Sequence, residues 1–81
     1  MKITHPTLVS GDIVFSAWDT VTVWNVGQYD QRRPPKVVSY LKKNDLCFVI
    51  DCNKTQSVVK ILTTDGHVGW VDRYFVIIVQ D

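Results

Sequence analysis

The feature that most constrains this chain is its excess of side chains branched at Cβ. It contains 14 valines, 6 isoleucines and 7 threonines among 81 residues, but only one alanine, four leucines and no glutamate. Branched side chains lose rotamer freedom against a preceding helical turn and pack well on a pleated surface. The composition therefore predicts an all-β fold with no helix longer than a single turn.

Short hydrophobic runs, separated by turn residues, divide the chain into expected strands. These runs cover residues 12–17, 20–26, 37–41, 46–52, 57–63, 67–71 and 75–79. The break at residues 72–74 predicts one 3₁₀ turn before the last strand. Seven short runs with Gly and Asp turns between them are typical of a small antiparallel barrel.

Glycine and Asx residues mark the expected turns. Asn44 and Asp45 supply one turn, and Asp65-Gly66 predicts a tight type I′ hairpin with both residues at positive φ. Gly69 lies inside a hydrophobic run, where glycine indicates a bulge or a close approach of two backbones.

The length of the chain allows a single domain over residues 1–81. We expect residues 1–10 to be an N-terminal extension or an edge segment, and the polar, proline-bearing residues 27–36 to form a long loop. A core of this size contributes only about 3–5 kcal/mol, so we expect a closed barrel, which leaves no sheet edge exposed.

Three segments, by their order and spacing, resemble the bacterial SH3-like (SH3b) family. They are residues 21–25 (VTVWN), 37–45 (VVSYLKKND) and 66–71 (GHVGWV), and the resemblance spans residues 20–79. It implies a small SH3-like barrel of five to seven short antiparallel strands with one 3₁₀ turn. Members of this family often bind the cell wall.

The chain departs from that family where recognition is concerned. Trp24 replaces the family's strand arginine, and Asn44 replaces the glycine of its turn. In eukaryotic SH3 domains a tryptophan pair and a proline line the proline-peptide groove, and the corresponding positions here are residues 56–58 and Asp72. The aromatic surface that docks PxxP peptides therefore lacks its central wall.

Charge and cysteine usage narrow the classes of partner. The net charge of +1 gives no strong field for nucleic acid or anionic membrane, so a nucleic-acid-binding barrel is the competing class and no membrane partner is expected. Residues 1–10 lack the apolar stretch of a signal peptide, which makes cell-wall binding a weaker hypothesis for this chain. Cys47 and Cys52 are expected on opposite faces of one strand, unpaired, and typical of a cytoplasmic protein.

The sequence contains no pattern that favours catalysis. His5 and His67 stand beside turn residues and read as solvated loop residues. Neither cysteine adjoins a basic cluster that would activate a thiol, so we expect a non-enzymatic protein without a cofactor. A zinc site built from Cys47, Asp51, Cys52 and His67 would lack the knuckle spacing of structural zinc sites.

Aromatic residues carry the strongest signal for binding. Three tryptophans and three tyrosines exceed what a narrow barrel can bury, so some of them must face solvent. Trp18, Tyr29, Trp70 and Tyr74 are expected to form an aromatic patch on one side. Trp24 and Trp70 also fit a second role, as structural plugs over the ends of the barrel.

The sequence thus predicts a protein-interaction module or a small structural subunit that binds a protein or peptide. Arg32 and Arg33 of the long loop add positive charge to the expected patch. The predicted contact residues are Trp18, Tyr29, Arg32, Arg33, Trp70 and Tyr74. The apolar run 75–79 leaves one further alternative, a homo-oligomer formed through an exposed edge strand.

Overall fold

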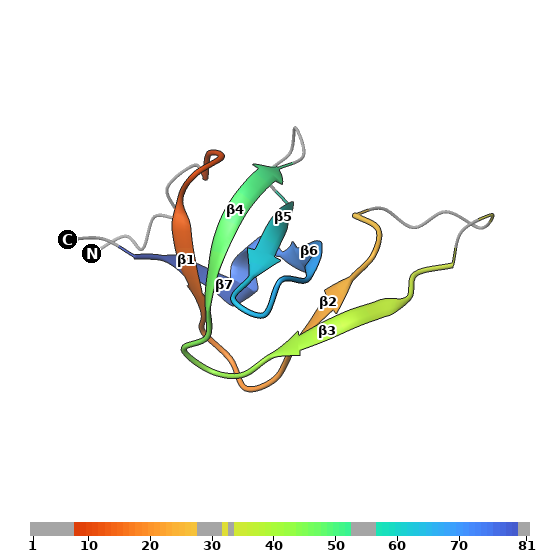
Figure 1. Ribbon diagram of the computed structural model, residues 1–81, viewed down its shortest axis with the longest axis horizontal. Helices are drawn as coiled ribbons and strands as arrows, with labels where there is room; N and C mark the ends of the chain where they lie inside the picture. The colour runs from red at the N-terminus through yellow and green to blue at the C-terminus, as the bar shows by residue number, and fades with distance from the viewer. Residues whose placement is uncertain (1–7, 28–31, 33, 53–56, 80–81) are drawn as a thin grey trace.

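A computed structural model describes residues 8–27, 32, 34–52 and 57–79. These residues form seven strands and one 3₁₀ helix, η1, and no α-helix lies within these ranges (Figure 1). In chain order the elements are β1 (Ile13–Ser16), β2 (Val21–Trp24), β3 (Val37–Leu41), β4 (Leu46–Cys52), β5 (Val58–Thr63), β6 (Val68–Asp72), η1 (Arg73–Phe75) and β7 (Val76–Ile78). The predicted all-β class with one 3₁₀ turn is confirmed.

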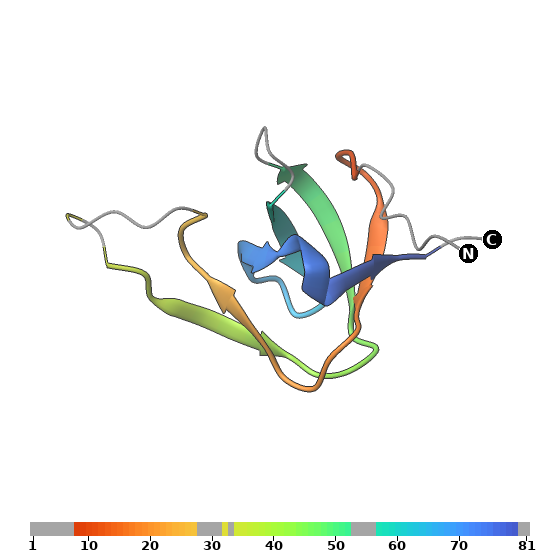
Figure 2. The ribbon, with the colours of Figure 1, turned by 180° about the vertical axis from the view of Figure 1, so that it is seen from behind.

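The seven strands make one antiparallel sheet in the order β3-β2-β6-β5-β4-β1-β7. The closure that we expected is not found, because β3 and β7 are the two ends of the sheet and do not pair. Within the sheet, β2 and β6 pair at a single register position, Trp24 with Trp70. The β2–β3 hairpin reaches away from the rest of the sheet (Figures 1 and 2). The remaining strands, β1 and β4 to β7, are called the body below.

Alternate residues of the strands point to the core, as a half-buried antiparallel sheet requires. In β5, for example, Val59, Ile61 and Thr63 are buried while the residues between them are partly exposed. Leu8, from the segment expected to be an extension, is also buried. The core consists of Leu8, Val14, Val21, Val23, Leu41, Cys47, Val49, Val59, Ile61, Val71 and Val76.

A β-bulge in β4 changes where the second cysteine points. The register with β5 shifts between Val49 and Asp51, so one extra residue enters β4 and reverses the alternation after it. Cys52 therefore packs against the core, on the same side as the buried Cys47, and the prediction of opposite faces is wrong. Both thiols are free.

The β5–β6 hairpin forms where the Asp-Gly pair predicted it, but with a different turn. Thr63 N donates to the His67 carbonyl (2.8 Å) and Gly66 N donates to the Thr63 carbonyl (3.1 Å), which makes a three-residue loop. Gly66 has a φ of 89°, whereas the only described non-glycine residue with positive φ is Asn44. The predicted type I′ turn, which needs Asp65 at positive φ as well, is therefore wrong.

The predicted 3₁₀ turn begins one residue later than expected. Asp72 is its N-cap, and the Asp72 Oδ1 atom accepts a hydrogen bond from Tyr74 N (2.8 Å). The turn reverses the chain and delivers β7 to the outer edge of β1, where Phe15 faces Ile77. Within the described ranges, no helix is long and apolar enough to cross a bilayer.

Gly69 brings two backbones together, as its place in the sequence predicted. A Cβ atom at this position would lie 2.5 Å from Val23 Cγ1 and 2.7 Å from the Trp24 carbonyl oxygen. Both distances are shorter than van der Waals contact, and one of the atoms belongs to a backbone that cannot rotate away. The junction of β6 with β2 therefore requires glycine here.

We expect Gly69→Ala to destabilise the fold by about 1–3 kcal/mol, because the added methyl overpacks the β2–β6 junction. Urea denaturation followed by far-UV circular dichroism measures the change. Val9→Thr, at a position that is 57% exposed and lies outside this junction, is the control and should stay within about 0.5 kcal/mol of the wild type. Equal stability of Gly69→Ala and wild type would contradict the close approach.

Candidate functional site

A groove of about 480 Å³ lies where the β2–β3 hairpin meets the body of the sheet. Its volume falls in the range of sites that hold small ligands or short peptide segments. Residues of both parts line it: Thr20, Val21, Thr22, Trp24, Val26, Gly27 and Pro35 from the hairpin, and Val58, Trp70, Val71, Asp72 and Phe75 from the body.

Two tryptophans that are cross-strand partners line this groove. Trp24 and Trp70 face each other in the register of β2 and β6. In β6, Gly69 and Val71 point to the core, so Trp70 between them points outward and stays partly exposed. Trp24 is 38% exposed. Because both rings remain accessible, the groove offers a partner two large, rigid apolar surfaces.

Gly27 holds the Trp70 ring against the hairpin. A Cβ atom at Gly27 would lie 2.8 Å from Trp70 Cδ2 and 2.9 Å from Trp70 Cε3, so the indole packs directly on the glycine backbone. Any larger residue at position 27 would push the ring out of place. The loop that follows β2 thereby fixes the orientation of one wall of the groove.

The polar groups of the groove are few. Among its described lining residues, Asp72 is the only one with a charged side chain, and it is exposed at the N-cap of η1. Thr20 and Thr22 add hydroxyl groups along β2. The groove is thus largely apolar, with one negative charge at the side formed by β6 and η1.

The predicted contact residues differ in whether they line the groove. Trp70 lines the groove. Trp18, in the β1–β2 turn, and Tyr74, on η1, are 60% and 66% exposed but do not belong to the lining. Arg32 is exposed in the loop between β2 and β3 and is also absent from the lining. The two other predicted residues, Tyr29 and Arg33, lie outside the described residues.

Sequence reasoning did not include Trp24 or Phe75 among the contact residues. A signal for Trp24 was present, because alternation in β2 puts it on the face opposite Val21 and Val23, which are buried. The prediction chose Tyr74 from the aromatic residues at the 3₁₀ turn, whereas its neighbour Phe75 is the one that lines the groove.

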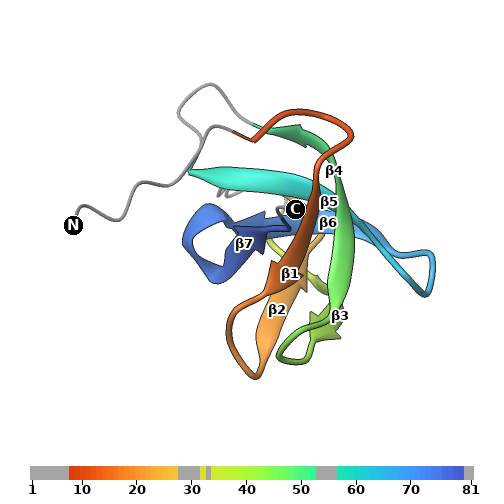
Figure 3. The same cartoon turned by 90° about the vertical axis from the view of Figure 1, so that its left-hand side faces the viewer.

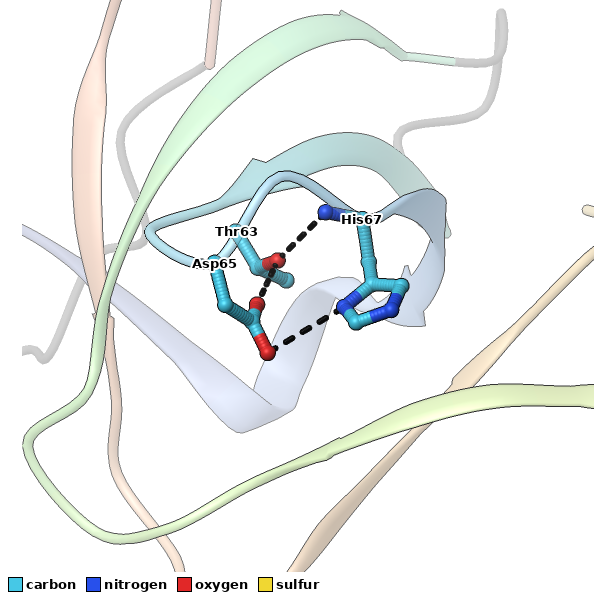
Figure 4. A network of polar contacts seen from close by, with 3 residues as sticks. All are labelled: Thr63, Asp65 and His67. Carbon is cyan, nitrogen blue, oxygen red and sulfur yellow. Dashed lines mark hydrogen bonds and ion pairs between the residues drawn. The ribbon is translucent and has the colours of Figure 1, made fainter.

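A polar network at the β5–β6 hairpin brings together a hydroxyl, a carboxylate and an imidazole group (Figure 4), and its His67 is the only histidine among the described residues. Thr63 Oγ1 donates a hydrogen bond to Asp65 Oδ1 and accepts one from His67 N (2.9 Å). The His67 Nδ1 atom lies 3.2 Å from Asp65 Oδ2. All three residues belong to the turn or to the strand ends that flank it.

The order of these contacts fits a turn held by side-chain hydrogen bonds and differs from that of a catalytic triad. In a hydrolytic triad the imidazole contacts the nucleophilic hydroxyl and the carboxylate stands behind the imidazole. Here the Asp65 carboxylate stands between the Thr63 hydroxyl and the His67 ring, and the hydroxyl donates its proton to that carboxylate. The three side chains thus stabilise the three-residue loop by connecting it to the strands on either side.

Cysteine chemistry and metal binding have little support in the geometry. Burial, followed by the negative charges of Asp45 and Asp65, raises the pKa of the Cys47 thiol to about 11, so Cys47 stays protonated at neutral pH. Across the described ranges, no group of three or more His, Cys, Asp or Glu side chains comes together as metal ligands.

Comparison with protein-family models, with curated proteins and with solved structures finds no match to this chain. The groove and the surfaces around it are therefore interpreted from their own chemistry.

The hairpin network makes stability depend on pH. The hydrogen bond from Thr63, and then that with His67, lowers the pKa of Asp65 from its ordinary value of 3.8. A carboxyl group whose pKa is lower in the folded state stabilises the fold above its unfolded pKa. That contribution is lost as the pH falls through the lowered folded pKa.

We therefore expect the stability difference between wild type and Asp65→Asn to shrink as the pH is lowered from 6 to below 3.8. Urea denaturation at a series of pH values measures it. Thr63→Val keeps the branched shape and removes the hydrogen bond to Asp65. Its stability should therefore depend less on pH than that of the wild type. A constant difference between wild type and Asp65→Asn over this range would contradict the role of the carboxylate.

Proposed function

We propose that this domain is a protein-interaction module that binds an extended peptide segment of a partner in the groove between β2 and β6. The observation that carries the proposal is the Trp24–Trp70 pair, which lines an open, largely apolar groove. Tryptophan is the residue most enriched among those that dominate binding energy at interfaces, because a rigid ring supplies much contact area at little entropic cost.

The edge of β2 supports an extended ligand. β2 pairs with β6 only at Trp24. The residues before it, Thr20, Val21 and Thr22, have no partner in β6 and line the groove. A peptide in this position runs alongside β2 and places alternate side chains toward the tryptophans. The resemblance to SH3-like modules agrees with this use of the fold, although the aromatic positions differ.

The charge of the groove indicates the chemistry of the ligand. The carboxylate of Asp72 favours a peptide with one Lys or Arg beside its apolar residues. The same carboxylate repels phosphate, so it disfavours nucleic acid in this groove. Arg32, exposed in the loop that joins β2 and β3, supplies the opposite charge outside the groove.

The proposal predicts that the groove tryptophan, and not the most exposed one, is needed for binding. Peptides selected from a random phage-displayed library on the immobilised domain should contain apolar residues with one Lys or Arg. Trp24→Ala should weaken their affinity at least about 30-fold, the loss typical of an interface hot spot. Isothermal titration calorimetry with synthetic copies of the selected peptides measures this.

Trp18→Ala is the matched control, because Trp18 is 60% exposed and does not line the groove. It should bind the selected peptides like wild type, provided that circular dichroism shows both variants folded. Equal losses for Trp18→Ala and Trp24→Ala would contradict the groove and favour the patch predicted from the sequence. Failure to select any peptide would contradict the proposed function.

The salt dependence of affinity distinguishes peptide binding from the competing function, nucleic-acid binding. A protein that neutralises several phosphates loses about 10³–10⁵ in affinity between 50 and 200 mM salt. An apolar contact with one ion pair should lose less than about tenfold over that range. The same titration, repeated at both salt concentrations, tests it, and a steep loss would contradict an aromatic contact.

A further inference from the structure

One face of the body packs on the core, and the opposite, outward face is unusually apolar. An antiparallel sheet with one face in water normally alternates apolar inward with polar outward residues. In β4, however, the inward residues Cys47 and Val49 alternate with Leu46 and Phe48, which are 49% and 51% exposed. Strands that are hydrophobic on both faces are typical of sheets covered on both sides.

The register places these outward residues in two cross-strand rows. The first row runs over β7, β1 and β4, where Phe15 faces Ile77 on one side and Leu46 on the other. Figure 3 shows these three strands side by side. Directly opposed apolar side chains in a sheet are in contact, so this row is continuous.

The second row lies beside the first and runs over β1, β4, β5 and β6. Ile13 faces Phe48, Phe48 faces Leu62, and Leu62 faces Val68. Neither row contains a charged or polar residue. The two rows together are called the apolar outer face below.

The apolar outer face is large enough to hold two chains together. Five of its side chains are 40–51% exposed and the remaining two, Phe15 and Leu62, are half-buried. This corresponds to on the order of 500 Å² of apolar surface, the size of the largest apolar patch on a typical monomer, and patches of this size are often functional. Two such faces in contact bury about 1,000 Å², the lower limit of specific interfaces, which corresponds to a weak dimer that dissociates on dilution.

Charge favours a second copy as the occupant. The two rows contain no charge, so two identical faces meet without repulsion, and the net charge of +1 gives little long-range repulsion between chains. The next cross-strand position carries both signs, since Asp51 faces Lys60. Identical rims can therefore pair across a two-fold axis.

We propose that a second copy of this chain covers the apolar outer face and forms a two-fold symmetric dimer. The contact differs from the edge-strand association expected from the sequence, because it uses side chains of five strands and leaves the backbone edge of β7 outside. It does not rest on the peptide groove. Val58 and Asp72, which line the groove, are at the opposite ends of β5 and β6 from Leu62 and Val68.

The test is the mass of the whole chain in solution. Size-exclusion chromatography with light scattering should give twice the 9.3 kDa of one chain at high concentration, with dissociation on dilution. Phe48→Lys puts a charge at the centre of the contact twice per dimer and should raise the dissociation constant at least about 100-fold. Ile77→Lys, in the other row, provides a second variant in case the first fails to fold.

Tyr40→Lys is the matched control, since Tyr40 is 60% exposed on β3 and lies outside the apolar outer face. It adds the same charge and should leave the dimer intact. A wild-type chain that stays monomeric at every concentration would overturn the proposal, as would a dimer that survives both Phe48→Lys and Ile77→Lys, which is the outcome of edge-strand pairing. Peptide binding at the groove should persist in the monomeric variants.

Discussion

The rest of the structure depends on the contact between β6 and β2 at Gly69. Because Gly69 has no side chain, Val23 reaches the core beside it and the Trp24 backbone comes close to β6. This contact sets Trp24 and Trp70 side by side and attaches the β2–β3 hairpin to the body. Since the two strands pair nowhere else, the hairpin diverges from the body, and the divergence opens the groove.

Much of the fold could be predicted because it follows from local chemistry. The β-branched composition and the alternation of side chains gave the strands, and β3 and β4 have the predicted bounds. Two features depended on more distant or finer contacts. The β5–β6 turn is accompanied by a side-chain hydrogen bond between Thr63 and Asp65, and the openness of the sheet depends on whether β3 and β7 meet, which no local pattern encodes.

The candidate site could be predicted only in part, for a related reason. Aromatic content showed that some rings must be exposed, but the sequence left open whether Trp24 and Trp70 are structural plugs or contact residues. The structure places both on outward positions. Their meeting in one groove depends on the register between strands that are far apart in the sequence. Trp18 is exposed as expected, yet exposure alone did not indicate which aromatic residues share a concave surface.

The two proposed surfaces, a groove for a peptide and an apolar face for a second copy, are separate. The groove exists only if the hairpin is docked on β6, and a nuclear Overhauser spectrum of the isotopically labelled protein tests this most directly. We predict cross-peaks between the Gly69 α-protons and a Val23 methyl group, and between the Gly27 α-protons and the Trp70 indole. Spectra of a folded protein in which both contacts are absent would show the hairpin undocked and would contradict the groove.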